Sequence, residues 1–154
     1  DYKQQLVKIT NKNNRTGTLS DALEGADVFI GVSKANVVSK EMIQSMNSGP
    51  IVFAMANPTP EISPQDARDA GAAVVGTGRS DFPNQINNAL AFPGVFRGAL
   101  DVRAARITNE MKIAAAHALA NCVNPTKENI LPNMFDKSIV KNISEAVKAA
   151  AARV

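Results

Sequence analysis

Four short segments of the sequence carry residue types that could bind a small polar ligand. Three of them directly follow apolar runs, and they read Gly31-Val32-Ser33, Ala56-Asn57-Pro58 and Gly76-Thr77-Gly78. The fourth places two adjacent amides, Asn87 and Asn88, shortly before a proline. Small residues let a ligand approach the backbone, and Asn side chains can donate hydrogen bonds to a carboxylate or a carboxamide. These types therefore favour the binding of a small acid or of the amide and ribose groups of a nucleotide.

Each of these segments also has a purely structural interpretation. Gly and Asn are common turn residues at the ends of strands. Asn87 and Asn88 could equally cap or turn the chain before the next helix. The ligand interpretation gains weight only if the segments lie together at one edge of a sheet.

Several kinds of chemistry have no support in the sequence. The phosphate-binding Gly-x-Gly-x-x-Gly pattern is absent, since the Gly76-Thr77-Gly78 segment lacks its third glycine. Metal-ligand spacing of His, Cys or acidic residues is also absent. His117 and Cys122 stand alone and are interpreted as structural residues, whereas Lys34 is either a phosphate partner or a solvated charge.

The elements that would position these residues form a repeating strand–helix pattern. Apolar runs at residues 27–31, 51–55 and 73–76 are continuous rather than alternating, which is typical of strands buried on both faces of a parallel sheet. Helices are predicted between them at residues 39–46 and 63–71, the second with Ser63 as N-cap and Pro64 in its first turn. Right-handed crossovers make this an open parallel α/β sheet whose strand ends share one edge.

The remaining segments are predicted to be helical. Helices are expected at residues 2–10, at 21–24 with Ser20 as N-cap, from Pro93 to about 102, at 108–122 with Thr108 as N-cap, and at 138–153. About three strands are few for a complete doubly wound domain, so the chain is expected to form half of one.

Composition limits the function further. The chain has 154 residues, a net charge of +3, 5% aromatic residues and no Trp, which argues against a nucleic-acid partner. No apolar run approaches the roughly 20 residues of a membrane span. The single Cys122 excludes an internal disulfide, suits a reducing compartment and predicts a cytoplasmic protein. The start at Asp1, without an initiator Met, suggests that further chain precedes it.

Two long segments resemble the malic enzymes of bacteria and archaea. Residues 52–62 read VFAMANPTPEI, which is similar to the family's strand that ends in an Asn-Pro-Thr turn. Residues 76–88 read GTGRSDFPNQINN, and residues 91–101 read AFPGVFRGALD. Residues 19–33 fit the preceding helix and strand of the family.

This resemblance implies a fold, a reaction and a set of ligands. Residues 1–154 would be the C-terminal half of a Rossmann-like NAD-binding domain, and the enzyme would oxidise and decarboxylate malate to pyruvate with NAD or NADP and Mg²⁺ or Mn²⁺. Asn57 would contact substrate and nicotinamide, Asn88 with Asn87 beside it would bind substrate, and Gly31, Val32 and Ser33 would line the cofactor site. The family's catalytic Tyr and Lys, its acidic metal ligands and its phosphate loop would precede residue 1.

The chain is therefore expected to be inactive by itself, with the rest of the enzyme chain as partner and a homo-oligomer as the assembly. A stand-alone nucleotide-binding module and an assembly module without catalysis are the alternatives. Nucleotide binding by the isolated chain separates the first alternative from the enzyme fragment.

Overall fold

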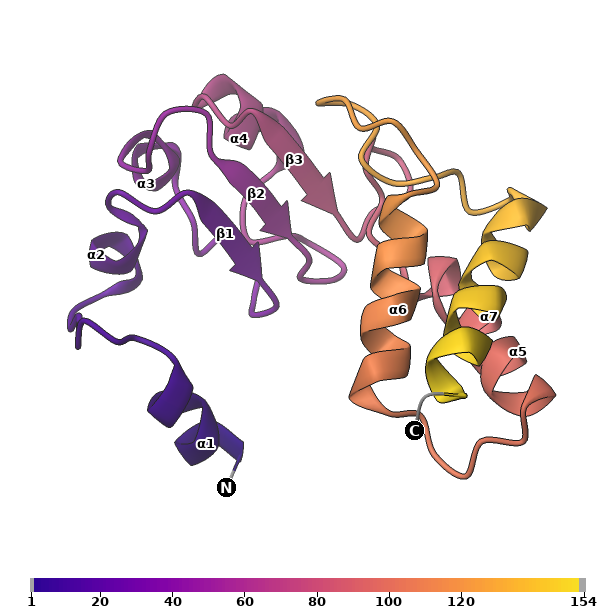
Figure 1. Cartoon of the computed structure of the whole chain (residues 1–154). Coiled ribbons are helices and arrows are strands. Elements are labelled where there is room, and N and C mark those ends of the chain that lie inside the picture. Colours follow the sequence, from indigo (N-terminus) through magenta and orange to yellow (C-terminus); the bar gives the residue numbers. More distant parts are fainter. Residues whose placement is uncertain (1, 153–154) are drawn as a thin grey trace.

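The computed structural model describes residues 2–152, which form a parallel sheet with short helices followed by a three-helix unit (Figure 1). In chain order the elements are α1 (Tyr2–Ile9), α2 (Leu19–Leu23), β1 (Val28–Gly31), α3 (Lys40–Gln44), β2 (Ile51–Ala54), α4 (Pro64–Asp69), β3 (Val74–Thr77), the 3-10 turn η1 (Asn88–Leu90), α5 (Phe92–Asp101), α6 (Asn109–Ala120) and α7 (Lys137–Ala151).

The sheet is parallel and has the strand order β1-β2-β3. Gly31 at the end of β1 is level with Ala54, and Ala54 is level with Thr77 at the end of β3. The three predicted strands are therefore confirmed, and their carboxyl ends lie at the same edge. The Rossmann-like α/β fold with a helical C-terminal region is confirmed as well.

Two predicted helix starts are confirmed at the level of single hydrogen bonds. The Ser63 hydroxyl accepts the Asp66 backbone N–H at 3.0 Å, and Pro64 occupies the first turn, where its missing N–H has no cost. The Thr108 hydroxyl accepts the Met111 backbone N–H at 3.3 Å and begins α6.

Two other predicted helix starts are wrong, that of α2 by two residues and that of α7 by one. The N-cap of α2 is Thr18 rather than Ser20, because the Asp21 carboxylate accepts the Thr18 N–H at 2.6 Å and closes a capping box. Helix α7 begins at Lys137 rather than at Ser138, and its N-cap is Asp136, whose carboxylate accepts the Ser138 N–H at 2.9 Å. In both cases a carboxylate supplies the acceptor that the helix start needs.

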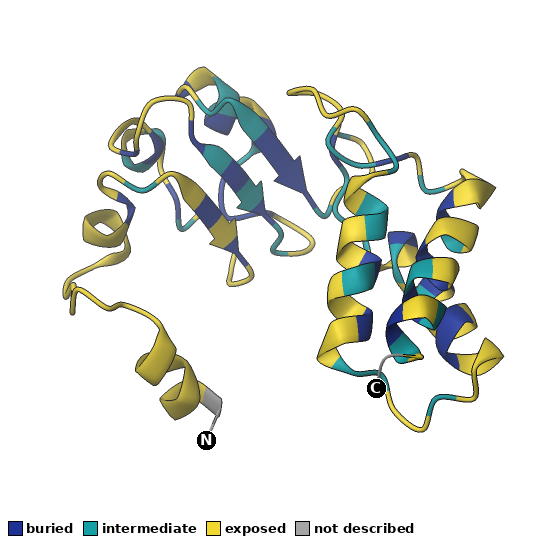
Figure 2. Cartoon of the chain, in the orientation of Figure 1, coloured by how far each residue is buried: buried dark blue, intermediate teal, exposed yellow. Residues whose placement is uncertain are grey.

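Within the described residues one face of the sheet is covered, and the other face is exposed along β1. Phe29, Val52 and Val75 are buried on the face that packs against α3 and α4. On the opposite face Val28 is 46% exposed and Ile30 is 62% exposed, and Figure 2 shows this alternation along β1. The expectation of strands buried on both faces is therefore wrong for β1. Right-handed crossovers that all proceed in one direction put their helices on one face, so none of these helices covers the other face of β1.

The three C-terminal helices have a buried cluster of their own, separate from the sheet cluster. Ile143 and Val147 of α7 are fully buried there. A Cβ atom on Gly94 would lie 2.6 Å from the Ile143 Cβ, and one on Gly98 would lie 2.8 Å from the Val147 Cβ. The two glycines therefore allow α5 to approach α7 closely.

None of the helices formed by residues 2–152 is long and apolar enough to cross a membrane.

Candidate functional site

The loops that follow the three strands all begin at the carboxyl edge of the sheet. The Met55 backbone N–H donates to the Gly31 carbonyl at 3.0 Å, so the first residue after β2 is directly joined to the last residue of β1. A Cβ on Gly78 would lie 3.6 Å from the Met55 carbonyl oxygen, which places the loop after β3 against the loop after β2. This edge is the position at which open parallel sheets bind their ligands.

The segment that carries the paired amides extends the same edge. Gln85 forms a parallel bridge with Thr77, and the Ile86 backbone N–H donates to the Thr77 carbonyl at 2.8 Å. The chain therefore runs beside the end of β3 in the strand direction. Asn87 and Asn88 follow where it passes the edge, so all four segments of the predicted site meet there.

The three predicted amides differ in what their side chains do. The Asn87 side-chain oxygen accepts the Ala89 backbone N–H at 2.9 Å, which makes Asn87 the N-cap of η1. Asn57 and Asn88 are exposed, and neither side chain forms a hydrogen bond within residues 2–152. The Asn57–Pro58 peptide bond is cis. The structural interpretation thus applies to Asn87, while Asn57 and Asn88 keep their full donor and acceptor capacity for a ligand.

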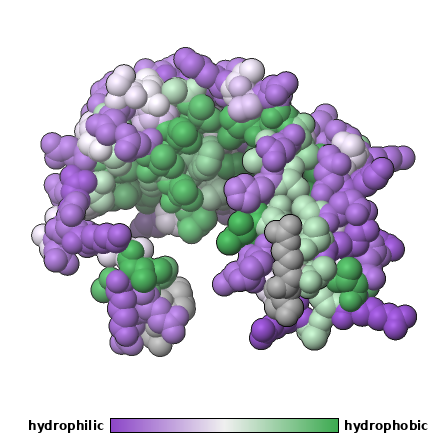
Figure 3. All heavy atoms as spheres, in the orientation of Figure 1, coloured by the Kyte–Doolittle hydropathy of each residue, from purple (hydrophilic) through white to green (hydrophobic). Residues whose placement is uncertain are grey.

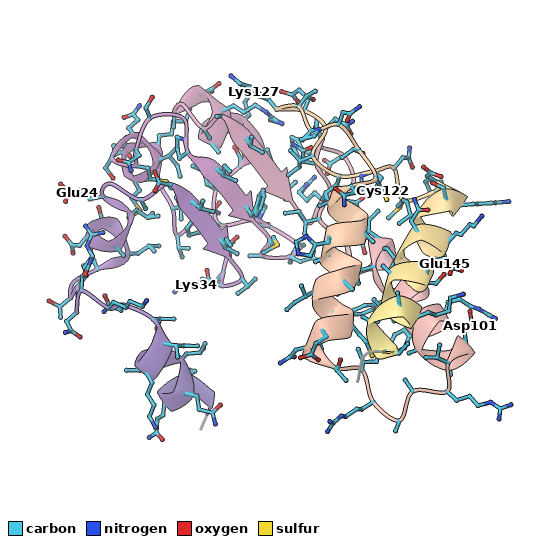
Figure 4. All side chains as sticks on the ribbon, viewed as in Figure 1. Glu24, Lys34, Asp101, Cys122, Lys127 and Glu145 are labelled. Atoms are coloured by element: carbon cyan, nitrogen blue, oxygen red, sulfur yellow. The ribbon has the colours of Figure 1, made fainter. Side chains whose placement is uncertain are left out.

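The first two residues after β1 are both exposed but differ in their contacts. The Val32 side chain is 78% exposed. Ser33 instead uses both its backbone N–H and its hydroxyl as donors to Glu61, at 2.7 Å and 3.1 Å. Lys34 follows in the same loop and is exposed (Figure 4).

Glu61 is a site residue that the sequence did not reveal. It is 0% exposed, and its second carboxylate oxygen accepts the Ala56 backbone N–H at 3.0 Å. Burial alone would raise the pKa of Glu61, but the hydrogen bonds from the Ser33 and Ala56 N–H groups and the Ser33 hydroxyl outweigh burial and lower it. Its partner Ser33 is 28 residues away along the chain, so local spacing carried no signal for this contact.

Asn84 is a second buried polar residue that sequence reasoning missed. Its side-chain nitrogen donates to the carbonyls of Val75 and Lys127, at 3.1 Å and 2.9 Å, and its oxygen accepts the Ile130 N–H at 2.9 Å. Lys127 lies in the loop between α6 and α7 (Figure 4). Asn84 therefore joins the loop between α6 and α7 to β3 through hydrogen bonds. Its φ of 57° lies in the left-handed region, where Asn is favoured over most other residues.

The charged residue of the loop after β3 is already paired. The Arg79 guanidinium donates two hydrogen bonds to the Asp81 carboxylate, at 2.8 Å and 2.6 Å. It also lies 5.5 Å from the centre of the Phe82 ring. The hydrogen bond from Arg79 lowers the pKa of Asp81, so the pair remains ionised and neutral overall at neutral pH.

Two further observations define what the site can hold. Residues 2–152 contain no group of three His, Cys, Asp or Glu side chains that could hold a metal ion. A hollow of about 460 Å³ lies between residues 80–90 and 128–135; Asn84 and Gln85 line it, but Asn57 and Asn88 do not. The edge with the free amides is therefore open, so it is suited to form one wall of a ligand site.

The sheet, its crossovers and the polar carboxyl edge define a Rossmann-like α/β unit. The family model described as malic enzyme, NAD binding domain matches residues 1–154, and the chain belongs to this family.

Curated relatives and solved structures agree with this assignment. The chain is 56% identical to a bifunctional malic/malolactic enzyme of Bacillus subtilis, across 98% of this chain and 38% of that protein. It is 50% identical to an NAD-dependent malic enzyme of Geobacillus stearothermophilus, across 99% of this chain and 32% of that protein. The crystal structure of an NAD-dependent malic enzyme from Thermotoga maritima matches with 48% identity and a TM-score of 0.93, across 96% of this chain and 39% of that one. The chain thus spans less than two fifths of the length of these relatives.

Proposed function

We propose that this chain is the C-terminal half of the dinucleotide-binding domain of a malic enzyme. The enzyme oxidises and decarboxylates malate to pyruvate and CO₂ while it reduces NAD or NADP. The observation that carries this proposal is the pair of exposed amides, Asn57 and Asn88, without internal partners at the carboxyl edge of a parallel sheet. Membership of the malic enzyme family supplies the reaction.

In this proposal the chain binds and orients the reactants. Asn57 and Asn88 donate hydrogen bonds to the carboxylates of malate as neutral groups, and Asn57 also contacts the nicotinamide side of the site. Asn87 holds the turn that presents Asn88. Gly31, Val32 and Ser33 would form the wall along the dinucleotide, which would supply the hydride acceptor of the reaction. Correct placement of the two reactants is the part of the rate acceleration that this chain supplies.

The metal ion of the reaction is proposed to bind to residues outside this chain. The Mg²⁺ or Mn²⁺ ion that such an enzyme uses would polarise the substrate oxygen. Because residues 2–152 hold no suitable ligand cluster, the ion would be bound by other residues of the enzyme. The isolated chain is accordingly proposed to be inactive.

The remainder of the enzyme chain is the proposed partner of the bare sheet face. Val28, Ile30 and Val32 are exposed on β1 and its loop, and Figure 3 shows apolar side chains gathered over the sheet. Exposed apolar surface of this kind is costly in water and marks a contact surface. The relatives contain more than half of their length outside the matched region, which is enough chain to cover it. A cytoplasmic homo-oligomer completes the proposal.

The amides can be tested in the full-length enzyme that contains this chain. Asn57→Ala or Asn88→Ala removes a donor to a charged ligand, which corresponds to about 1.5–3 kcal/mol, or roughly a 10- to 150-fold loss of kcat/KM for malate. Asn13→Ala is the matched control, because Asn13 is exposed in the loop between α1 and α2.

Unchanged kinetics in both site variants would refute the site assignment. A full-length enzyme that binds NADH but never turns malate over would instead favour a nucleotide-binding module.

A further inference from the structure

We propose that Glu61 is a positioning residue that fixes the cofactor loop after β1 and the amide loop after β2 in one geometry. This inference rests on the proposed function, since it concerns the same edge of the sheet. Glu61 itself is fully buried and would touch neither malate nor cofactor.

One carboxylate joins the two loops through different oxygens. Oε1 accepts the backbone N–H and the hydroxyl of Ser33, whereas Oε2 accepts the backbone N–H of Ala56. Ala56 directly precedes Asn57, and Ser33 directly follows Val32. A displacement of the carboxylate would therefore move both ligand-binding loops together.

The Glu61 carboxylate accepts hydrogen bonds from backbone N–H groups that could otherwise donate to a ligand. Free N–H groups at strand ends can bind anions. Because Glu61 already occupies those of Ser33 and Ala56, these two amides are not available to a phosphate or to malate. Each loop then offers its exposed side chain instead, Val32 in one case and Asn57 in the other.

The position of the Glu61 carboxylate requires a glycine at position 31. A Cβ atom at position 31 would lie 2.6 Å from both Cδ and Oε1 of Glu61, and 2.8 Å from the end of the Phe29 ring. No larger residue fits there while Glu61 keeps its place. The backbone also supports the carboxylate, because the Glu61 carbonyl accepts the Val38 N–H at 3.0 Å.

A carboxylate suits this position better than an amide of the same shape. Three donors converge on the two oxygens of Glu61, and an ionised carboxylate is an acceptor on both of them. In Glu61→Gln one acceptor becomes an NH₂ group that faces another donor. The variant thus keeps the volume of the side chain and breaks one of the two links.

The decisive experiment compares Glu61→Gln with Glu24→Gln in the full-length enzyme. Glu24 is exposed beyond the end of α2 and serves as the matched control (Figure 4). At a temperature at which urea unfolding shows each variant to be fully folded, Glu61→Gln should lower kcat/KM for malate about tenfold, as the loss of one hydrogen bond to the carboxylate implies. The Kd for NADH, measured by fluorescence titration, should rise as well, while Glu24→Gln matches the wild type.

A residue with a merely structural role would change the unfolding midpoint alone. If folded Glu61→Gln keeps wild-type kcat, KM and NADH affinity, the positioning role is overturned. Asn57→Ala and Asn88→Ala keep this result separate from the proposed function. If they reduce turnover and Glu61→Gln does not, only the positioning role fails; if neither amide matters, the proposed site itself fails.

Hydrogen exchange decides the case in which Glu61→Gln does not fold. In the wild-type enzyme the amides of Ser33 and Ala56 should exchange at least about tenfold more slowly than the amide of Asn13 in an exposed loop. Exchange of both amides at the rate of Asn13 would show that Glu61 does not hold them, and would overturn the proposal.

Discussion

In both the sheet part and the helical part, a neighbouring side chain fills the space that the Cβ atom of a larger residue would occupy at a glycine. In the sheet part Gly31 makes room for the carboxylate of Glu61, which is hydrogen-bonded to two loops. In the helical part Gly94 and Gly98 make room for Ile143 and Val147, which are apolar. The missing Cβ of glycine therefore makes room for a hydrogen-bonded carboxylate in the sheet part and for apolar side chains in the helical part.

This difference separates the region with exposed ligand-binding groups from the region that stabilises the fold. The polar contact lies at the edge where exposed Asn57 and Asn88 have no internal partners. The apolar contacts lie within the cluster between α5, α6 and α7, which contributes stability by burial. Asn84 joins the two regions through hydrogen bonds to Val75 of β3 and to the loop before α7. A change in the helical part should accordingly alter stability more than ligand binding.

The strongest test of this separation is Ile143→Ala. Ile143 is 0% exposed, so the loss of its side chain should leave a cavity that lowers the free energy of unfolding by about 2–5 kcal/mol. Urea unfolding measures this change. Ile113→Ala is the control, since Ile113 on α6 is 58% exposed, and its effect should stay within about 0.5 kcal/mol. Equal effects of the two variants would contradict the assigned core.

Gly98→Ala is expected to have a smaller effect on the same core. The added Cβ would lie 2.7 Å from the Ser144 carbonyl oxygen and 2.8 Å from the Val147 Cβ. Helices α5 and α7 would have to move apart, which should lower the free energy of unfolding by about 1–3 kcal/mol. The better helix propensity of Ala offsets part of this loss. An increase in the urea midpoint would show that the close approach of α5 to α7 is not required.

Lys40→Met should have the smallest effect. Lys40 pairs with Asp66 at 2.8 Å and so joins α3 to α4, but their side chains are 42% and 47% exposed. Solvent and salt screen such a pair. The hydrogen bond to Asp66 raises the pKa of Lys40, so the amine stays charged at neutral pH. The urea midpoint should remain close to that of the wild type, and a change as large as that of Gly98→Ala would contradict this view of the sheet part.

Local patterns predicted the elements well wherever a single segment decides the outcome. The Ser63-Pro64 start of α4 and the Thr108 start of α6 need only neighbouring residues, and both were predicted correctly. Thr18 was missed because Ser20 is an equally good cap by type, and only the Asp21 carboxylate distinguishes between them.

The candidate site was predicted through topology and missed where distant residues meet. Parallel strands placed Ser33 and Asn57 at one edge, as the order of elements required. Asn88 was assigned to the site only by the family resemblance, and a bridge between Gln85 and Thr77 brings its segment to this edge. Glu61 could not be found in the same way, because its main partner is 28 residues distant. The bare face of β1 was missed for a related reason: an apolar strand does not reveal which of its faces the rest of the chain covers.

A crystal structure of the full-length enzyme with malate and the dinucleotide bound would show directly whether the two amides bind the ligands and Glu61 holds the two loops. We expect the Asn57 and Asn88 amides to lie within about 3.5 Å of ligand oxygen atoms, while the Ser33 and Ala56 N–H groups still donate to Glu61. Ligands bound away from both amides, or a Ser33 N–H group that leaves Glu61 for a phosphate, would contradict it.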